Sequence, residues 1–344
     1  MSNELLQKVV DTALVGGGQG GILNPEQSNR FIDYMWDATV LGQTVRQIRM
    51  NAPVREIDKM DLGQRIARHA TEGVDDGVNA SPTFSKITLT TEKIRLDWEL
   101  TSEALEDNIE EANLEDHIAR LMATQLGNDL EDLAINGDDA ADPSEDGYAL
   151  LKAFDGYRKR SLDGGVVLSA NGETINTSIF NRAYKAMPRK YKVRRDQLRF
   201  FTSSGLVQDY HEFLASLGVQ NEAFAQIIQP GNPAIQPGPT KGLSPLRPFG
   251  IPLFEVPLYR EDETGTYDAG DAAEGADTTA ENHGHVELTH PDNRLWGIKR
   301  EIKVYRKFAE KKDAVEFTVY TRQGVQIDNL ESYVVVNDVR NKAF

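Results

Sequence analysis

The residues in this chain that come closest to a chemical site are carboxylates gathered in one short stretch. Hard cations such as calcium bind where several oxygen ligands come from one loop. Counting from Asp142, however, the twelfth position is Ala153, where the helix-loop-helix calcium pattern places a glutamate. We therefore favour a solvated acidic loop over a cation site, and we predict neither a metal nor a cofactor. The stretch consists of Asp138, Asp139, Asp142, Glu145 and Asp146.

Three histidines and a glycine run are weaker candidates for chemistry. His283, His285 and His290 are close enough in sequence for a transition-metal site, but we expect them to lie in an exposed loop. The glycines at 16–21 have the spacing of a dinucleotide-binding loop, yet no suitable strand precedes them and no Lys-Ser or Lys-Thr pair follows. We interpret them as a flexible hinge. The sequence has no GxSxG elbow and no local Ser-His-Asp arrangement that would indicate nucleophilic hydrolysis.

One dense positive stretch lies within an acidic chain. With 54 Asp and Glu against 38 Lys and Arg, the formal charge is -16, so the average surface repels phosphate backbones. We therefore favour ion pairing with acidic neighbouring subunits over nucleic-acid contact as the role of the stretch. Its cationic members are Arg182, Lys185, Arg189, Lys190, Lys192, Arg194 and Arg195.

Composition limits the class of protein. A chain of 344 residues with 39% hydrophobic and 27% charged residues is long enough for two moderate cores and is expected to fold. The absence of cysteine excludes disulfides and thiolate sites and fits a reducing cytosol. No run reaches the roughly 20 apolar residues of a bilayer span, and the start lacks the apolar core of a signal peptide. We expect a soluble, non-secreted protein with no membrane partner, and an acidic cytosolic enzyme is one such class.

Two N-terminal segments lack an evident core of their own. Residues 1–50 read as an arm that ends in a helix with Phe31 and Trp36 on one face. Residues 51–100 alternate as strands around a polar, glycine-rich middle, which is typical of a long projecting hairpin. On its return limb the apolar residues change from odd to even positions, which predicts a bulge or twist between 90 and 93.

The clearest helix is predicted over 114–136. Asn113 is placed as its N-cap, and leucines recur at helical spacing until Asn136 and Gly137. At ~1.5 Å per residue this helix would be roughly 33 Å long, which suits a structural spine.

A compact region that mixes helices and strands is expected over 149–289. Within it Ser178 is placed to cap a helix, and a further helix begins after Ser203 or Ser204. Prolines between 229 and 257 exclude regular helix there, and the acidic stretch 261–281, which lacks Lys and Arg, is expected to be exposed.

This order of elements resembles the Hong Kong 97 capsid fold of tailed bacteriophages and herpesviruses, which is an α+β fold. The text IRLDWELTSEALEDN at 94–108 is similar to the passage from the E-loop into the spine helix. PDNRLWGIKREIKV at 291–304 is similar to the strand that returns to the P domain, and Gly250-Ile251-Pro252 matches the turn before an A-domain strand. The resemblance spans nearly the whole chain, and the order of elements is more specific than any one motif.

The resemblance implies a division into five parts. Residues 1–50 would be the N-terminal arm, 51–100 the E-loop hairpin, 101–148 the spine-helix part of the P domain and 149–289 the A domain. Residues 290–344 would return to the P domain, with the last strand in either the P or the A domain.

The resemblance also implies a function: a major capsid protein that is no enzyme, is located in the virion capsid and assembles in the host cytoplasm. The implied partners are other copies as hexamers and pentamers, a separate scaffolding protein, a portal protein, an optional decoration protein and weakly contacted double-stranded DNA. Phe31, Trp36 and Trp98 are candidate interface anchors, although a core position is equally compatible with each. Encapsulin shells share the fold and stay as the nearest alternative.

In one branch of the family, Lys-Asn isopeptide bonds cross-link the subunits of the shell covalently. Here Lys59 or Lys86 could supply the amine, and Asn329 or Asn337 the amide. No motif marks these residues, so we disfavour such a cross-link.

Overall fold

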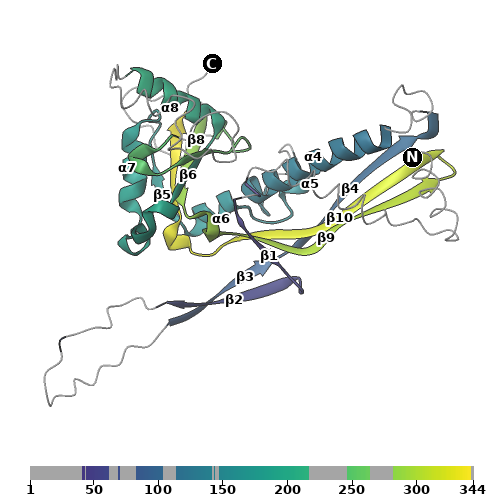
Figure 1. Cartoon of the computed structure of the whole chain (residues 1–344), viewed down its shortest axis with the longest axis horizontal. Coiled ribbons are helices and arrows are strands. Elements are labelled where there is room, and N and C mark those ends of the chain that lie inside the picture. The colour runs from purple at the N-terminus through teal and green to yellow at the C-terminus, as the bar shows by residue number, and fades with distance from the viewer. Residues whose placement is uncertain are drawn as a thin grey trace, which may run out of the picture.

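The computed structural model describes most of the chain. The described residues are 41–42, 44–61, 69, 83–103, 114–141, 143, 147–216, 246–263 and 282–341. Figure 1 shows three parts: a long narrow sheet with a helix along it, a compact unit around a second sheet, and a thin hairpin that projects near the place where the other two meet. None of the described helices is both long enough and apolar enough to cross a membrane.

The long sheet has four strands in the order β1-β9-β10-β4. Strands β9 (Arg294–Ala309) and β10 (Ala314–Ile327) form an antiparallel hairpin, β4 (Glu92–Thr101) pairs antiparallel with β10, and the short β1 (Arg46–Arg49) pairs parallel with β9. Alternate residues of β10, among them Val315, Phe317 and Val319, are buried, as expected of a sheet with one covered face.

Helix α4 (Leu114–Asn136) covers that face, and its bounds confirm the helix predicted from the sequence. Leu126, Leu130 and Leu133 repeat at helical spacing and are buried in one core with the β10 residues. Leu121, by contrast, is 57% exposed, so the apolar stripe of the helix extends beyond the surface that the described part of the chain covers. Asn113 and its predicted capping role lie outside the described residues.

The end of α4 requires glycine. A Cβ added at Gly137 would come within 2.3 Å of the carbonyl oxygen of Phe154, so only a residue without a side chain allows the chain to turn here. The short α5 (Tyr148–Leu151) and α6 (Tyr157–Gly164) follow and lead into the compact unit.

The projecting hairpin is a separate two-stranded sheet. Strands β2 (Val54–Asp61) and β3 (Thr83–Thr90) pair antiparallel along their whole length. Thr91 separates β3 from β4, and its amide and hydroxyl groups donate to the carbonyl oxygen of Pro53 at 3.0 and 2.9 Å. The change of parity between 90 and 93 therefore marks a break between strands of two different sheets and not a bulge or twist within one hairpin limb. The prediction of a projecting hairpin over all of 51–100 is wrong in its last part, because β4 pairs with β10 in the long sheet.

The compact unit contains a five-stranded sheet in the order β5-β11-β8-β6-β7. Its strands are β5 (Val166–Ser169), β6 (Arg199–Thr202), β7 (Leu253–Glu255), β8 (His283–Thr289) and β11 (Val334–Arg340). Helices α7 (Thr177–Ala186) and α8 (Ser204–Ser216) pack on it, and α8 confirms the helix predicted after Ser203.

Two sequence interpretations in this unit are wrong. The N-cap of α7 is Asn176 and not Ser178, because the Asn176 side chain accepts from the amides of Ser178 and Ile179 at 2.8 and 3.2 Å. His283 and His285 do not lie in an exposed loop. They belong to β8, a central strand in which every residue is buried.

Several predicted features fall outside the described residues. They are Phe31, Trp36, the glycine run at 16–21, most of the proline-rich stretch and nearly all of the acidic stretch after Glu263.

Candidate functional site

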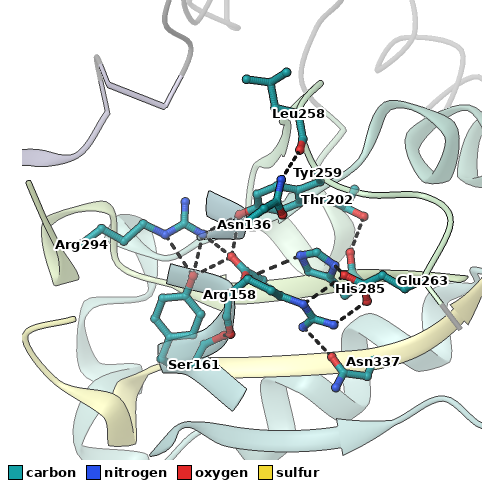
Figure 2. Close-up of polar contacts among 12 residues, drawn as sticks. Asn136, Arg158, Ser161, Thr202, Leu258, Tyr259, Glu263, His285, Arg294 and Asn337 are labelled. Carbon is teal, nitrogen blue, oxygen red and sulfur yellow. Dashed lines mark hydrogen bonds and ion pairs between the residues drawn. The ribbon is translucent and has the colours of Figure 1, made fainter. Parts of the chain in front are cut away.

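A buried polar network occupies the junction of the two larger sheets (Figure 2). Glu287 comes from β8 of the compact unit, and Arg294 begins β9 of the long sheet. The two side chains form an ion pair and are only 1% and 0% exposed. Tyr259 and Tyr333 each donate a hydroxyl hydrogen bond to Glu287 Oε2 at 2.6 Å, and Arg294 Nη2 donates to both hydroxyl oxygens at 2.8 Å.

The charges in this cluster compensate one another. Burial by itself would raise the pKa of Glu287, but Arg294, then His285 and the two tyrosine hydroxyls, hold this pKa below its usual value. Burial also raises the pKa values of Tyr259 and Tyr333 well above normal, so both phenols stay neutral donors. The result is a desolvated Arg-Glu pair in which the two phenols supply further hydrogen bonds, while Arg294 Nη1 is buried with no hydrogen-bond partner among the described residues.

A second layer extends the network to helix α6. Arg158 donates to Glu263 Oε2 and to Asn337 Oδ1, both at 2.6 Å. The fully buried ring of His285 has Nδ1 3.4 Å from Glu263 and Nε2 3.7 Å from Glu287, and it stacks on Tyr259. Burial opposes ionisation of Glu263, yet His285 and Arg158 together lower its pKa to about 2.

This arrangement is suited to joining elements rather than to catalysis. The network links α6, β8, β9 and β11, and Asn136 at the end of α4 adds a bond to the carbonyl oxygen of Leu258 at 3.1 Å. Buried ion pairs contribute little net stability, but breaking one leaves an uncompensated charge. The network therefore fixes the direction in which the long sheet leaves the compact unit.

The hairpin presents the opposite arrangement, with apolar side chains left outside. One of its faces is held by its own chain: Leu89 packs against Gly297, and Lys59 donates to the backbone of Asp328. On the other face the cross-strand partners Met60 and Phe84 are 67% and 69% exposed. Large exposed apolar side chains that pair on one face are typical of a contact surface.

The interface anchors predicted from the sequence have different surroundings. Trp98 is half-buried on the inner face of β4, where its ring stacks on Phe317 with centroids 5.0 Å apart. This position gives Trp98 a packing role within its own chain and leaves its exposed part for other contacts. Phe31 and Trp36 lie outside the described residues.

The predicted basic cluster spans α7 and the following 3-10 helix (Arg189–Gln197). Part of it is used internally, because Arg182 pairs with Glu173 at 2.7 Å and Lys190 with Glu331 at 2.5 Å. Lys192 and Arg195 make cation-π contacts with the ring of Tyr184. Lys185, Arg189, Arg194 and Arg195 are exposed, so the cluster presents positive charge at the surface.

The structure groups two residues of the predicted acidic stretch with a third carboxylate from outside it. Asp138 and Asp139 are joined by Asp155, with ligand atoms within 4.8 Å of one another, but Asp138 also pairs with Lys159 at 3.3 Å. Repulsion from Asp155, the largest cause, raises the pKa of Asp139. The later acids of the stretch, Asp142, Glu145 and Asp146, lie outside the described residues.

The cross-link candidates are engaged in ordinary contacts. Lys86 pairs with Glu56 at 2.7 Å on the exposed hairpin face, and Asn337 accepts from Arg158. Asn329 caps a turn by accepting from the amide of Glu331 at 3.2 Å.

The junction network was not found by sequence reasoning. One signal was present: Glu287 stands in a short run that is otherwise suited to a buried strand, and Arg294 stands directly before Leu295 and Trp296. A charged residue at a position that alternation assigns to the interior predicts a buried partner, but the sequence does not say which one.

Comparison with known proteins supports one class. The search for a matching family model found none. The chain is 30% identical over 287 residues to a Bacillus subtilis (strain 168) protein named "Putative prophage capsid protein YqbE", a match that covers 83% of this chain and 82% of the relative.

Solved structures agree on the fold. The chain superposes on a chain of the satellite phage P4 procapsid with a TM-score of 0.58 and 12% identity, covering 99% and 98% of the two chains. A chain from Microbacterium phage Oxtober96 gives 0.52 at 12% identity, covering 88% and 90%. The SrpI encapsulin of Synechococcus elongatus PCC 7942 gives 0.53 at 9% identity, covering 97% and 96%.

These likenesses identify the fold as the Hong Kong 97 capsid fold, and the Bacillus subtilis relative identifies the protein as one of the class that builds capsid shells. Within that class, the chain belongs to the family of prophage capsid proteins. The encapsulin likeness extends to the fold alone, so the encapsulin alternative has less support.

Proposed function

We propose that copies of this chain form the icosahedral shell that encloses the double-stranded DNA of a tailed phage, and that the chain has no enzymatic activity. Hexamers and pentamers would be the building blocks. The observation that carries the proposal is the hairpin, whose exposed Met60 and Phe84 have no covering surface among the described parts of their own chain.

The division into parts follows from the fold family. Residues 1–50 are assigned to the N-terminal arm, 51–100 to the E-loop, 101–148 to the spine-helix part of the P domain, 149–289 to the A domain and 290–344 to the return. Pairing of β11 with both β8 and β5 supports placing the last strand in the A domain.

The contacts between copies would come from several separate surfaces of the molecule. The apolar pair Met60 and Phe84 supplies the centre of one contact, and Phe31, Trp36 and the exposed part of Trp98 supply further anchors. The basic cluster from Arg182 to Arg195 would meet acidic surface of a neighbour and set the geometry of a ring more than its affinity. Obligate contacts of this kind bury more than about 2,000 Å².

The remaining partners rest on the resemblance to capsid proteins. They are a separate scaffolding protein, a portal protein and, optionally, a decoration protein, with assembly in the host cytoplasm. A net charge of -16 supports only weak contact with the packaged DNA.

Electron microscopy and sedimentation of the purified protein test this function. Expression with the scaffolding protein should give uniform closed shells of megadalton size, and expression without it aberrant shells or none. A small compact oligomer under both conditions would contradict the shell function and favour the cytosolic enzyme. Uniform shells from the chain alone would contradict only the need for a separate scaffold.

A further inference from the structure

The long sheet carries a positive, aromatic surface on the side opposite α4. Residues that pair across neighbouring strands share one face of the sheet. In the register of β9, β10 and β4, Lys303, Tyr320 and Arg95 form one row, and Arg322 and Lys93 lie in the next. Alternation places these residues away from the buried face that contacts α4.

The tyrosines hold this surface in a defined arrangement. Lys93 Nζ lies 4.2 Å from the centre of the Tyr320 ring, and Tyr305 meets the same ring edge-on with centroids 6.0 Å apart. Such contacts restrict long side chains before any partner arrives, which lowers the entropy lost on binding. We call the set the basic tyrosine face; it consists of Lys93, Arg95, Lys303, Tyr305, Tyr320 and Arg322.

Positive charge is in local excess at this part of the described surface. Within the basic tyrosine face, Arg95 pairs with Asp97 at 2.7 Å, whereas Lys93 and Lys303 are exposed. Farther along the same surface the charges balance, because Lys312 lies 3.0 Å from both Glu99 and Glu316. The excess therefore does not extend along β4 and β10 to the Lys312 end of this surface.

We propose that the basic tyrosine face binds a carboxylate-rich segment of a second copy of this chain. The inference rests on the proposed shell function. Copies with a charge of -16 repel one another on average, so contact is favoured where a positive surface meets an acidic one. The chain supplies two acidic stretches without Lys or Arg, at 103–116 and 261–281. Tyrosine and arginine also suit protein contacts, in which both are enriched.

Charge reversal at the two exposed lysines tests this contact. K93E/K303E should raise the subunit concentration needed for assembly at least about tenfold at low salt. The control K152E/K311E makes the same charge change at two exposed lysines outside the face and should assemble as the wild type does. Equal assembly of both variants would overturn this inference alone. Failure of the wild type to form shells, even with its scaffold, would instead overturn the proposed function.

Zero-length carbodiimide cross-linking identifies the partner segment. Particles assembled from mixed light and heavy-isotope subunits should give links from Lys93 or Lys303 to carboxylates of 103–116 or 261–281 in another copy. Links from these lysines confined to their own copy would contradict the proposal. A K93E/K303E protein that assembles normally but loses DNA binding would also contradict it, because the partner would then be a nucleic acid.

Discussion

The junction network and the projecting hairpin differ in which side chains they expose to water: the junction buries charged groups, and the hairpin exposes apolar ones. At the junction, Glu287 and Arg294 are withdrawn from water and each is engaged by the other and by phenols of the same chain. On the hairpin, Met60 and Phe84 remain in water although they are among the larger apolar side chains of the chain. An isolated two-stranded hairpin is at best marginally stable.

The contrast distinguishes contacts that form within one chain, at the junction, from contacts that require a second copy, at the hairpin. The junction ion pair is formed within a single chain, so we expect the subunit to have this arrangement before assembly. Among the described residues nothing covers Met60 and Phe84, and under the proposed function another copy would supply that surface. We propose that the junction contributes to the geometry of the shell and that the hairpin contributes to its cohesion.

The largest expected effect comes from making the hairpin surface polar. M60S/F84S should abolish assembly, because each lost apolar contact weakens an interface by about 1–3 kcal/mol and the loss repeats at every subunit. The free energy of unfolding of the dissociated subunit should stay within about 0.5 kcal/mol of the wild-type value, since neither side chain is buried there. Denaturant titration and electron microscopy measure the two quantities. A large loss of subunit stability would show that these side chains are buried in the free subunit, which would contradict the contrast between hairpin and junction.

The second prediction concerns the junction, where a substitution should lower the stability of the subunit itself. E287Q leaves Arg294 buried without its counter-charge and should lower the free energy of unfolding by about 3–5 kcal/mol. The matched control is E56Q, which breaks the exposed pair between Glu56 and Lys86 and should leave the denaturation curve unchanged. Equal denaturation curves for E287Q and E56Q would show that the Glu287-Arg294 pair is not required for the stability of the subunit.

Acid should weaken the junction in a defined range of pH. The pKa of Glu263 is lowered from 4.5 to about 2, so this carboxylate stabilises the folded chain fully above pH 4.5 and loses its contribution as the pH falls toward 2. The contribution is on the order of 3 kcal/mol. Unfolding free energies measured between pH 6 and about 2 should fall less steeply for E263Q than for the wild type. Identical pH profiles would contradict the assignment.

The smallest effect tests a local detail of the compact unit. N176A removes the cap of α7 and should lower the free energy of unfolding by about 1 kcal/mol, whereas S178A should have almost no effect. The reverse order of the two losses would restore Ser178 as the cap.

The sequence predicts the local elements well, because their signals are local. The leucine spacing of 114–136 defines α4, and the change of parity after Thr90 marks the passage from β3 to β4. Both depend on side chains only a few residues apart. The order of these elements was enough to recognise the fold.

The sequence does not reveal what depends on distant pairing. The burial of His285 requires knowing that β8 lies between β11 and β6, and nothing in the local text GHVEL shows this. The role of Asp155 beside Asp138 and Asp139 likewise depends on a turn after α4. The basic tyrosine face arises only when the register of three strands is known.

Hydrogen exchange of dissociated subunits and of assembled shells tests the central claim most directly. The claim predicts that amides of Val54–Asp61 and Thr83–Thr90 exchange quickly in the subunit and slowly in the shell, while amides of His283–Thr289 are protected in both. Strong protection of the hairpin in the dissociated subunit, unchanged by assembly, would show that it is complete on its own and would contradict the account.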